Sequence, residues 1–275
     1  MKRAIFVSAT ILMSGFVLSA CSKGVSTPSY EETLKQKCDG GGTEYCTALG
    51  EAYMNGGDVL NIKEDLYKAV FYLQKACNEK NAEACSNLGA AYATGKGVEL
   101  DRSKALQLYQ TACDGGDANS CSKVGIGYEI GLGVEQDSFK AVGFYERACN
   151  GGDALGCFSS GLGYGTGQGV KQDYIKALEY FRKACDGEFA RGCYNLGLMF
   201  ATGKGVNQDE VKALEFYGKA CEGDFAEGCF NLGLLYIYGE GVSQSKNEAL
   251  KYFGKACDLK LQSGCDGYAK LNVSE

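Results

Sequence analysis

Residues 88–105 read LGAAYATGKGVELDRSKA, and close variants of this stretch return along the rest of the chain. An apolar residue and a glycine are followed by an aromatic residue, then by Gly-x-Gly-Val and Asp-x-x-Lys-Ala. One copy later, Tyr128 and Asp137 stand 36 residues after Tyr92 and Asp101. A unit of about 20–50 residues that recurs in register is typical of solenoids, in which each unit packs only on its neighbours. The sequence therefore predicts a repeat array.

The cysteines recur with the same period. Apart from Cys21, each of the 15 cysteines belongs to a pair spaced by eight residues, and from Cys77 onward successive pairs are 36 residues apart. The first interval is 39 residues, which places an insertion near residues 57–60. Cysteine at this density is typical of an exported protein with a disulfide framework. The predicted bridges are Cys38–Cys46, Cys77–Cys85, Cys113–Cys121, Cys149–Cys157, Cys185–Cys193, Cys221–Cys229 and Cys257–Cys265.

Paired cysteines can also bind zinc. A four-cysteine zinc site would combine two neighbouring pairs, and one of the seven pairs would be left over. A junction between two antiparallel helices instead brings two Cα atoms within the roughly 4.4–6.8 Å that a disulfide requires. Closing a loop of about nine residues stabilises the fold by roughly 2–3 kcal/mol in the chain-entropy description. We therefore expect structural bridges, with no metal and no cofactor.

Each repeat is predicted to form two helices joined by a glycine turn. In the second helix, Ala105, Tyr109 and Ala112 recur at i, i+4 and i+7 and form one apolar stripe. Asp101 precedes that helix and is suited to cap its free backbone N–H groups. Gly-x-Gly favours a helix end with positive φ, and Gly89 would let a neighbouring helix approach closely. A phosphate-binding loop is the less favoured reading of these glycines, because no strand precedes them and they recur from repeat to repeat.

The quoted stretch resembles the Sel-one-like repeat, a relative of the tetratricopeptide repeat, and the added Ala-Cys-x₇-Cys pattern resembles the cysteine-rich Hcp family of bacteria. The resemblance covers residues 32–272. It implies an all-α fold, a right-handed α-solenoid of about six to seven disulfide-stapled helix-turn-helix repeats. The first helix of each repeat would line the concave face. The array is expected over residues 32–275, and the helix after Cys265 is expected to cap it.

Residues 1–20 resemble a bacterial lipoprotein signal peptide. A basic start precedes an uncharged apolar stretch that ends in Leu-Ser-Ala before Cys21. The resemblance implies cleavage before Cys21 and acylation of this residue, which would explain why it lacks a partner cysteine. Ser22 in place of an aspartate favours the outer membrane, and residues 21–31 are expected to form a flexible tether. We expect an exported, lipid-anchored envelope protein that faces the periplasm or the cell surface, with release from the membrane also open.

Composition excludes several classes of function. The net charge is −6, and nucleic-acid binding needs concentrated Lys and Arg, so no nucleic-acid partner is expected. The chain has no His, which removes the commonest general base and the commonest metal ligand. We expect a monomer that binds a membrane only through its lipid anchor.

The resemblance implies that a peptide or protein partner binds in the concave groove. The candidate contacts lie two residues after the second cysteine of a pair, with aromatic neighbours one position earlier. They are Asn87, Lys123, Asn195 and Asn231, with Phe158, Tyr194 and Phe230. An asparagine amide both donates and accepts hydrogen bonds, so it can pair with the backbone of any peptide. The alternative is that these asparagines only suit the start of a helix and that the aromatic residues belong to the core.

The competing hypothesis is an enzyme. The resemblance to the Hcp family also implies penicillin binding or weak β-lactamase activity, which needs an activated serine such as that of Ser-x-x-Lys. The chain contains Ser120-x-x-Lys123 and Ser243-x-x-Lys246, but neither Ser-Asp-Asn nor Lys-Thr-Gly. Ser120 and Lys123 are therefore only weak catalytic candidates. The binding scaffold is the favoured hypothesis.

Overall fold

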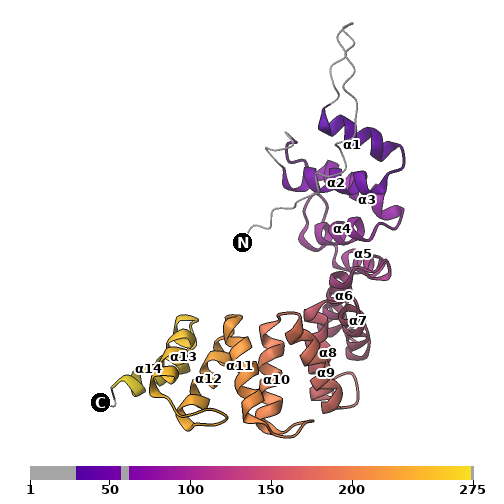
Figure 1. The fold of residues 1–275 in the computed structure, drawn as a ribbon. Coiled ribbons are helices and arrows are strands. Elements are labelled where there is room, and N and C mark those ends of the chain that lie inside the picture. Colours follow the sequence, from indigo (N-terminus) through magenta and orange to yellow (C-terminus); the bar gives the residue numbers. More distant parts are fainter. Residues whose placement is uncertain (1–28, 57–61, 274–275) are drawn as a thin grey trace, which may run out of the picture.

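The computed structural model describes residues 29–56 and 62–273, which form pairs of antiparallel helices (Figure 1). We call the even-numbered helices helix A and the odd-numbered helices helix B. The helices are α1 (Tyr30–Asp39), α2 (Thr43–Asn55), α3 (Leu66–Asn78), α4 (Ala82–Thr94), α5 (Arg102–Asp114), α6 (Ala118–Ile130), α7 (Ser138–Asn150), α8 (Ala154–Thr166), α9 (Tyr174–Asp186), α10 (Ala190–Thr202), α11 (Glu210–Glu222), α12 (Ala226–Tyr238), α13 (Lys246–Asp258) and α14 (Gln262–Asn272).

The helix pairs stack one after another into an arc. Each helix packs on the helices before and after it in the chain. Figure 1 shows a first arm, α1–α7, that continues into a second arm, α8–α14. In the first arm the A helices lie on the inner side of the arc and the B helices on the outer side. The predicted all-α solenoid of stapled helix pairs is confirmed.

Seven disulfides join the predicted cysteine pairs, with Cα atoms 4.4–4.8 Å apart. Each bridge links the end of a helix B to the start of the next helix A, as Cys113 of α5 does with Cys121 of α6. Every hairpin between repeats is therefore closed covalently. From α4 onward, the opposite edge of the solenoid, where a helix A turns into a helix B, is closed by glycine turns such as that of Gly95 and Gly97.

The glycine turns, and the capping residues that follow them, determine where each helix B begins. Asp101 accepts the backbone N–H of Lys104 at the start of α5, and Ser245 does the same for Glu248 at the start of α13. Gly97 lies close to the preceding repeat, and a Cβ there would come within 2.5 Å of the carbonyl oxygen of Leu66. The predicted cap is confirmed, and the second glycine of Gly-x-Gly allows a close backbone approach.

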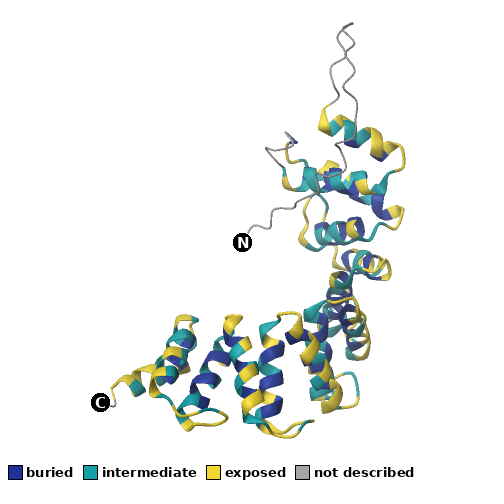
Figure 2. Ribbon diagram, in the orientation of Figure 1, coloured by how far each residue is buried: buried dark blue, intermediate teal, exposed yellow. Residues whose placement is uncertain are grey.

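The core runs along the line between the A and B helices (Figure 2). The ring of Tyr109 packs on Gly89, where a Cβ would lie 2.9 Å from it, so the predicted close approach is confirmed. Stacked ring pairs recur beside this line, such as Tyr164 with Tyr180 at 5.6 Å between centroids. Lys176 lies 4.8 Å above the outer face of Tyr164. The recurring lysine of Asp-x-x-Lys-Ala thus covers the recurring aromatic residue of helix A, a role that sequence inspection alone did not assign.

One predicted boundary needs correction. Residues 21–31 were expected to be a tether, but α1 begins at Tyr30. Ser29 accepts the backbone N–H of Glu32, and the Glu32 carboxylate accepts the backbone N–H of Ser29. This reciprocal capping box starts the helix two residues before the expected start of the array.

Candidate functional site

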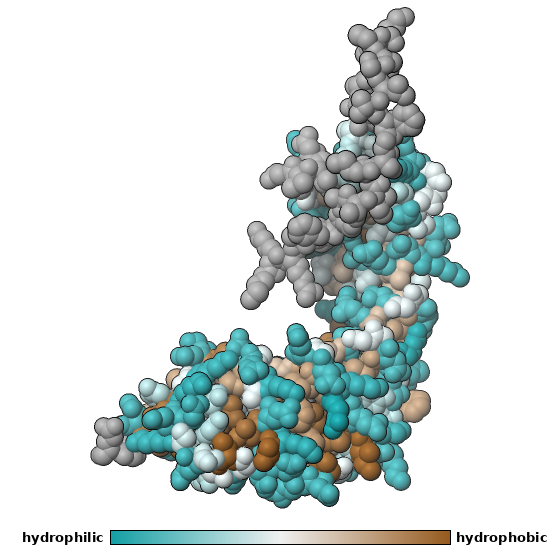
Figure 3. Space-filling model, viewed as in Figure 1, coloured by the Kyte–Doolittle hydropathy of each residue, from teal (hydrophilic) through white to brown (hydrophobic). Residues whose placement is uncertain are grey.

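One face of each helix A is left open by the packing of the repeats. Residues two before, two after, five after and nine after the second cysteine of a pair share this face, because they stand three or four residues apart. We call the surface they form along the array the helix A face. From α8 to α12, the position five after the cysteine carries Leu162, Leu198 and Leu234. Leu162 and Leu198 are each 39% exposed, and Figure 3 shows apolar surface over α10 and α12.

Two of the predicted asparagines accompany this leucine row. Asn195 is half-buried and donates from its side-chain amide to the carbonyl of Arg191, 2.9 Å away in the same helix. Asn231 is half-buried as well and hydrogen-bonds with the phenol of Tyr217. Both amides lie one turn from a leucine of the row, so polar and apolar contacts alternate along this part of the helix A face.

A cavity of about 330 Å³ lies between α2 and α4 on the same face. Its floor is Leu73 of α3, and its walls include Glu51 and the predicted Asn87. The Asn87 amide donates to the Glu51 carboxylate at 2.7 Å. Burial raises the pKa of Glu51, the nearby Glu83 carboxylate adds to the rise, and the Asn87 hydrogen bond opposes it.

A second cavity of about 330 Å³ lies between α6 and α8. Its floor includes Tyr145 of α7, whose hydroxyl donates to Glu129 at 2.6 Å. Burial and this carboxylate raise the pKa of Tyr145 well above its usual value. Leu155 and Leu162 form an apolar wall. A wider depression of about 770 Å³ beside the turn at residues 167–173 contains none of the predicted contact residues.

Lys123 fills the space between these two cavities. It stands on α6 at the repeat position of Asn87, and its ammonium lies 4.7 Å from the ring centroid of Tyr109. Burial lowers the pKa of Lys123, and the Asp117 carboxylate opposes that change. A predicted contact residue is thus half-buried against the preceding repeat.

Two of the predicted aromatic contacts, Tyr194 and Phe158, pack on a ring where one repeat meets the next, and the third packs on a ring of its own repeat. The ring of Tyr194 is 5.0 Å from that of Phe225, the residue before α12, and Phe158 is 5.1 Å from Phe189 in the same way. Phe230 packs on Phe253 at 5.5 Å. All three candidates are half-buried against the core. Their contact with a partner remains a prediction, while their packing role is plain in the structure.

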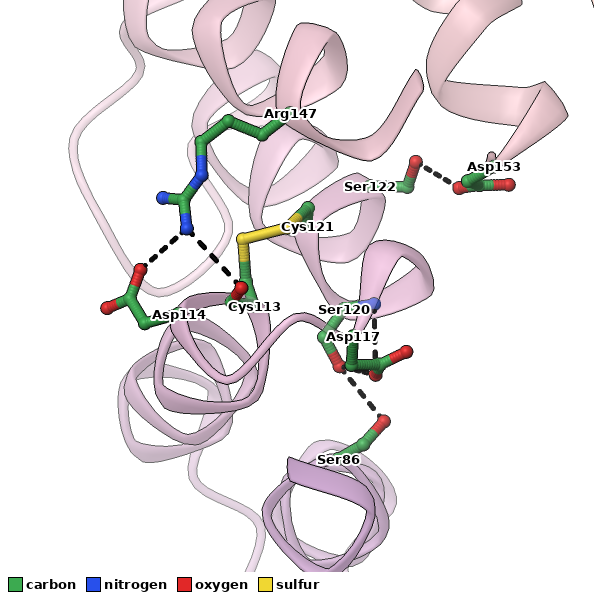
Figure 4. The surroundings of a disulfide bond; sticks show 9 residues. All are labelled: Ser86, Cys113, Asp114, Asp117, Ser120, Cys121, Ser122, Arg147 and Asp153. Carbon is green, nitrogen blue, oxygen red and sulfur yellow. Dashed lines mark hydrogen bonds and ion pairs between the residues drawn. A yellow bond between two sulfur atoms is a disulfide. The ribbon is translucent and has the colours of Figure 1, made fainter. Parts of the chain in front are cut away.

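Ser120 also lies at such a meeting point (Figure 4). Its side chain is fully buried, its Oγ donates to Asp117 Oδ2 at 2.5 Å, and it shares a hydrogen bond of 2.9 Å with Ser86 Oγ. Above it, Arg147 of α7 reaches back to the Asp114 carboxylate at 2.8 Å. A substrate could reach this serine only if the repeats separated, so the placement of Ser120 argues against a nucleophilic role.

Three further observations bear on the sequence predictions. Within residues 29–56 and 62–273, no cluster of three or more Asp, Glu, Cys or His side chains could hold a metal ion. Among the helices that the structure describes, none is long and apolar enough to cross a membrane. Cys21 and the predicted signal peptide lie outside the described residues.

Glu51 and Glu129, the carboxylates of the two cavities, were not among the predicted site residues. They stand five and eight residues after the second cysteine of their pairs, so they do not recur at one repeat position. An alignment of the repeats would show each as a carboxylate where the other repeats have apolar or small residues. This departure from the repeat pattern is the sequence signal that could have identified the two carboxylates.

Comparison with known proteins places these features in a family. Six consecutive segments match the Sel1 repeat, namely residues 43–81, 82–117, 118–153, 155–188, 190–225 and 226–261. A comparison with curated protein sequences found no match.

Solved structures share the fold. A protective antigen of uropathogenic Escherichia coli, c5321, which displays an SLR fold, matches with a TM-score of 0.80 and 28% identity over 85% of this chain and 50% of the antigen. This chain therefore spans half the length of that antigen. A Sel1 repeat protein from Oxalobacter formigenes matches with a TM-score of 0.65 and 28% identity over 70% of this chain and 82% of that protein. Cysteine rich protein B of Helicobacter pylori is 34% identical over 46% of this chain and 91% of its own, with a TM-score of 0.39. Because the Sel1 repeat matches six segments that cover more than half of its length, this chain belongs to the Sel1 repeat family.

Proposed function

We propose that this chain is a scaffold that binds a peptide or protein partner along its helix A face. The observation that carries the proposal is the row of Leu162, Leu198 and Leu234, which occupy the same place in three successive repeats; Leu162 and Leu198 are exposed and Leu234 is half-buried. Aliphatic side chains that recur on one exposed face mark an interaction surface more often than scattered ones do.

The amides beside this row suit an extended ligand. Asn195 and Asn231 offer donors and acceptors next to the leucines, and peptide backbones need both. An extended peptide could place apolar side chains on the leucines and backbone groups on the amides. Recognition of this kind depends on the spacing of the repeats, which the disulfides hold.

The β-lactamase alternative receives less support. Its serine candidate, Ser120, is 0% exposed and held between two other polar side chains, and Lys123 lies on the ring of Tyr109. Serine catalysis needs a nucleophile within reach of the substrate. We therefore expect any interaction with β-lactams to occur on the helix A face, without turnover at Ser120.

We also propose that the chain is exported and held on a bacterial envelope membrane, most favourably the outer membrane, by acylation of Cys21. Seven disulfides are typical of a protein that folds in an oxidising compartment outside the cytoplasm. The odd cysteine then needs another role, and acylation supplies one. Mass spectrometry of the membrane-extracted protein should show lipid on Cys21, and Cys21→Ser should release the protein into the soluble fraction. An unmodified Cys21 would contradict this.

Peptide selection followed by a point mutation tests the binding proposal. Peptides selected from a displayed library against the purified mature protein should lose at least about tenfold in affinity in Leu198→Asp. Val211→Asp is the matched control, because Val211 is a 63% exposed aliphatic residue on helix B. Peptides that are insensitive to Leu198→Asp, or that depend on Val211 instead, would place binding elsewhere and overturn the proposal. Circular dichroism would show that both variants stay folded.

A further inference from the structure

Three successive spaces between neighbouring A helices share one construction. Each is floored by the same residue of the intervening helix B, which is Leu73 in α3, Tyr109 in α5 and Tyr145 in α7. The spaces between α2 and α4 and between α6 and α8 are open cavities of about 330 Å³ each. The space between α4 and α6 differs, because the side chain of Lys123 lies in it.

Lys123 shows how a basic side chain lies in such a space. Its ammonium is 4.7 Å from the centroid of the Tyr109 ring. A cation above an aromatic face is attracted by the electron density of the ring, and the attraction grows as water is removed. In the two open spaces, the repeat position of Lys123 carries the shorter Asn87 and Ser159, which leave the volume empty.

Each open space also carries a carboxylate. In the α2–α4 space this is Glu51, which is half-buried, accepts the Asn87 amide and faces the negative charge of Glu83. Burial and the like charge of Glu83 both disfavour the ionised carboxylate of Glu51. A cation that entered the space would offset this cost and would itself be stabilised by the carboxylate. Lys96 is at the rim of this space, but it is exposed to solvent.

The α6–α8 space pairs its carboxylate with an apolar wall. Glu129 is half-buried, and the one described side-chain hydrogen bond to its carboxylate comes from the neutral hydroxyl of Tyr145. Ile126, Leu155 and Leu162 line the same space. A long aliphatic stem can lie on such a wall while its charged end reaches the carboxylate, as lysine and arginine side chains do.

We propose that the two open spaces are specificity pockets for lysine or arginine side chains of the partner. The inference rests on the proposed function, because it takes the partner to lie along the helix A face. Both spaces have volume for a long side chain and a carboxylate for its charge, and the α6–α8 space also has an aromatic floor, Tyr145, like the one that Lys123 uses in the middle space. The partner would then be a segment with basic residues at two places, on either side of the space that Lys123 fills.

Two small ligands, one charged and one neutral, test this inference without knowledge of the partner. The probes are N-acetyl-arginine methylamide and N-acetyl-citrulline methylamide, which have the same shape and differ in charge. In two-dimensional NMR titrations of the mature protein, the arginine probe should shift backbone amide signals around Glu51, Ala90, Glu129 and Leu162. Its affinity should exceed that of the citrulline probe by about fivefold, the size of a partly exposed ion pair.

Matched variants assign the binding to each pocket. Glu51→Gln should remove the preference for arginine at the α2–α4 pocket alone, and Glu129→Gln at the α6–α8 pocket alone. Glu222→Gln is the control, because it removes the same charge from an exposed position at the end of α11, a helix B. Equal shifts with both probes, or an arginine preference that Glu222→Gln lowers equally, would overturn the inference. Selected peptides that need Leu198 but lack basic residues would also overturn it, while the proposed function would stand.

Discussion

The two halves of the array join their repeats with different chemistry. In the first half, Ser122 of α6 donates to Asp153, the residue before α8, and Ser86 of α4 contacts Ser120 and through it Asp117. In the second half the same positions hold rings, and Phe158 packs on Phe189 as Tyr194 packs on Phe225. We call each such contact a repeat joint. Joints are polar up to α8 and aromatic beyond it.

The two positions of a joint change together. Where the residue after the second cysteine is Ser, the residue before the next helix A is Asp, which caps that helix. Where the first residue is aromatic, the second is Phe or, before α14, Leu, and within the residues that the structure describes no side-chain hydrogen bond caps the start of α10, α12 or α14. A helix start can therefore be stabilised by a side-chain hydrogen bond or by buried apolar area, and the partner across the joint determines which works.

A repeat joint that combines one aromatic and one acidic residue should cause the largest loss of stability. Ser122→Phe places a ring at a buried position and removes the hydroxyl that donates to the Asp153 carboxylate, so we expect a loss of about 3 kcal/mol in the free energy of unfolding. Urea denaturation followed by circular dichroism would measure it. The double variant Ser122→Phe with Asp153→Phe should recover at least about 1 kcal/mol, because it rebuilds an aromatic joint. Equal instability of the single and double variants would show that the two positions are independent.

Removing one ring from an aromatic joint should cost less. Phe225 is half-buried, with Tyr194 5.0 Å away and Arg191 6.0 Å from its ring. Phe225→Ala should lower stability by about 2 kcal/mol, below the value for a fully buried ring. Phe225→Asp loses the same ring but regains a helix cap, so it should cost about 1 kcal/mol less than the alanine variant. If the aspartate variant were the less stable of the two, the cap and the ring would not be alternatives.

The sequence was sufficient for the fold because every repeat carries the same local signals. The cysteine spacing, the Asp101 cap and the glycine turns each act within about ten residues, and their recurrence makes each repeat a check on the others. The aromatic joints were harder to predict. Tyr194 meets Phe225 31 residues further along the chain, and only a comparison of neighbouring repeats shows that the two positions change together.

The candidate site was predicted less completely than the fold. The residue two positions after the second cysteine of a pair was predicted as a candidate, and in two repeats it lies at a space between neighbouring A helices. Asn87 lines the α2–α4 cavity, and Lys123 lies in the space between α4 and α6. Glu51 and Glu129 were not predicted, because recurrence identifies only periodic residues and each of these glutamates interrupts a recurring position. In a repeat protein, periodic residues build the scaffold, whereas residues that break the period can distinguish one pocket from another.

The smallest effect concerns the backbone beside the joints. The residue two before each helix A has positive φ, and it is Gly152 before the polar joint at α8 but Glu188 before the aromatic joint at α10. Glu188→Gly should raise stability by about 0.5 kcal/mol, because relief of the left-handed conformation exceeds the added entropy of the unfolded chain. Gly152→Ala should lower it by about 1 kcal/mol, since nothing lies within 4 Å of a Cβ there and only the backbone conformation opposes the methyl group. Thermal denaturation of both variants would measure the pair. A stabilising Gly152→Ala would mean that this hairpin tolerates a side chain as the hairpin before α4 does, where Lys80 has a φ of 61°, so that the joints alone distinguish the two halves.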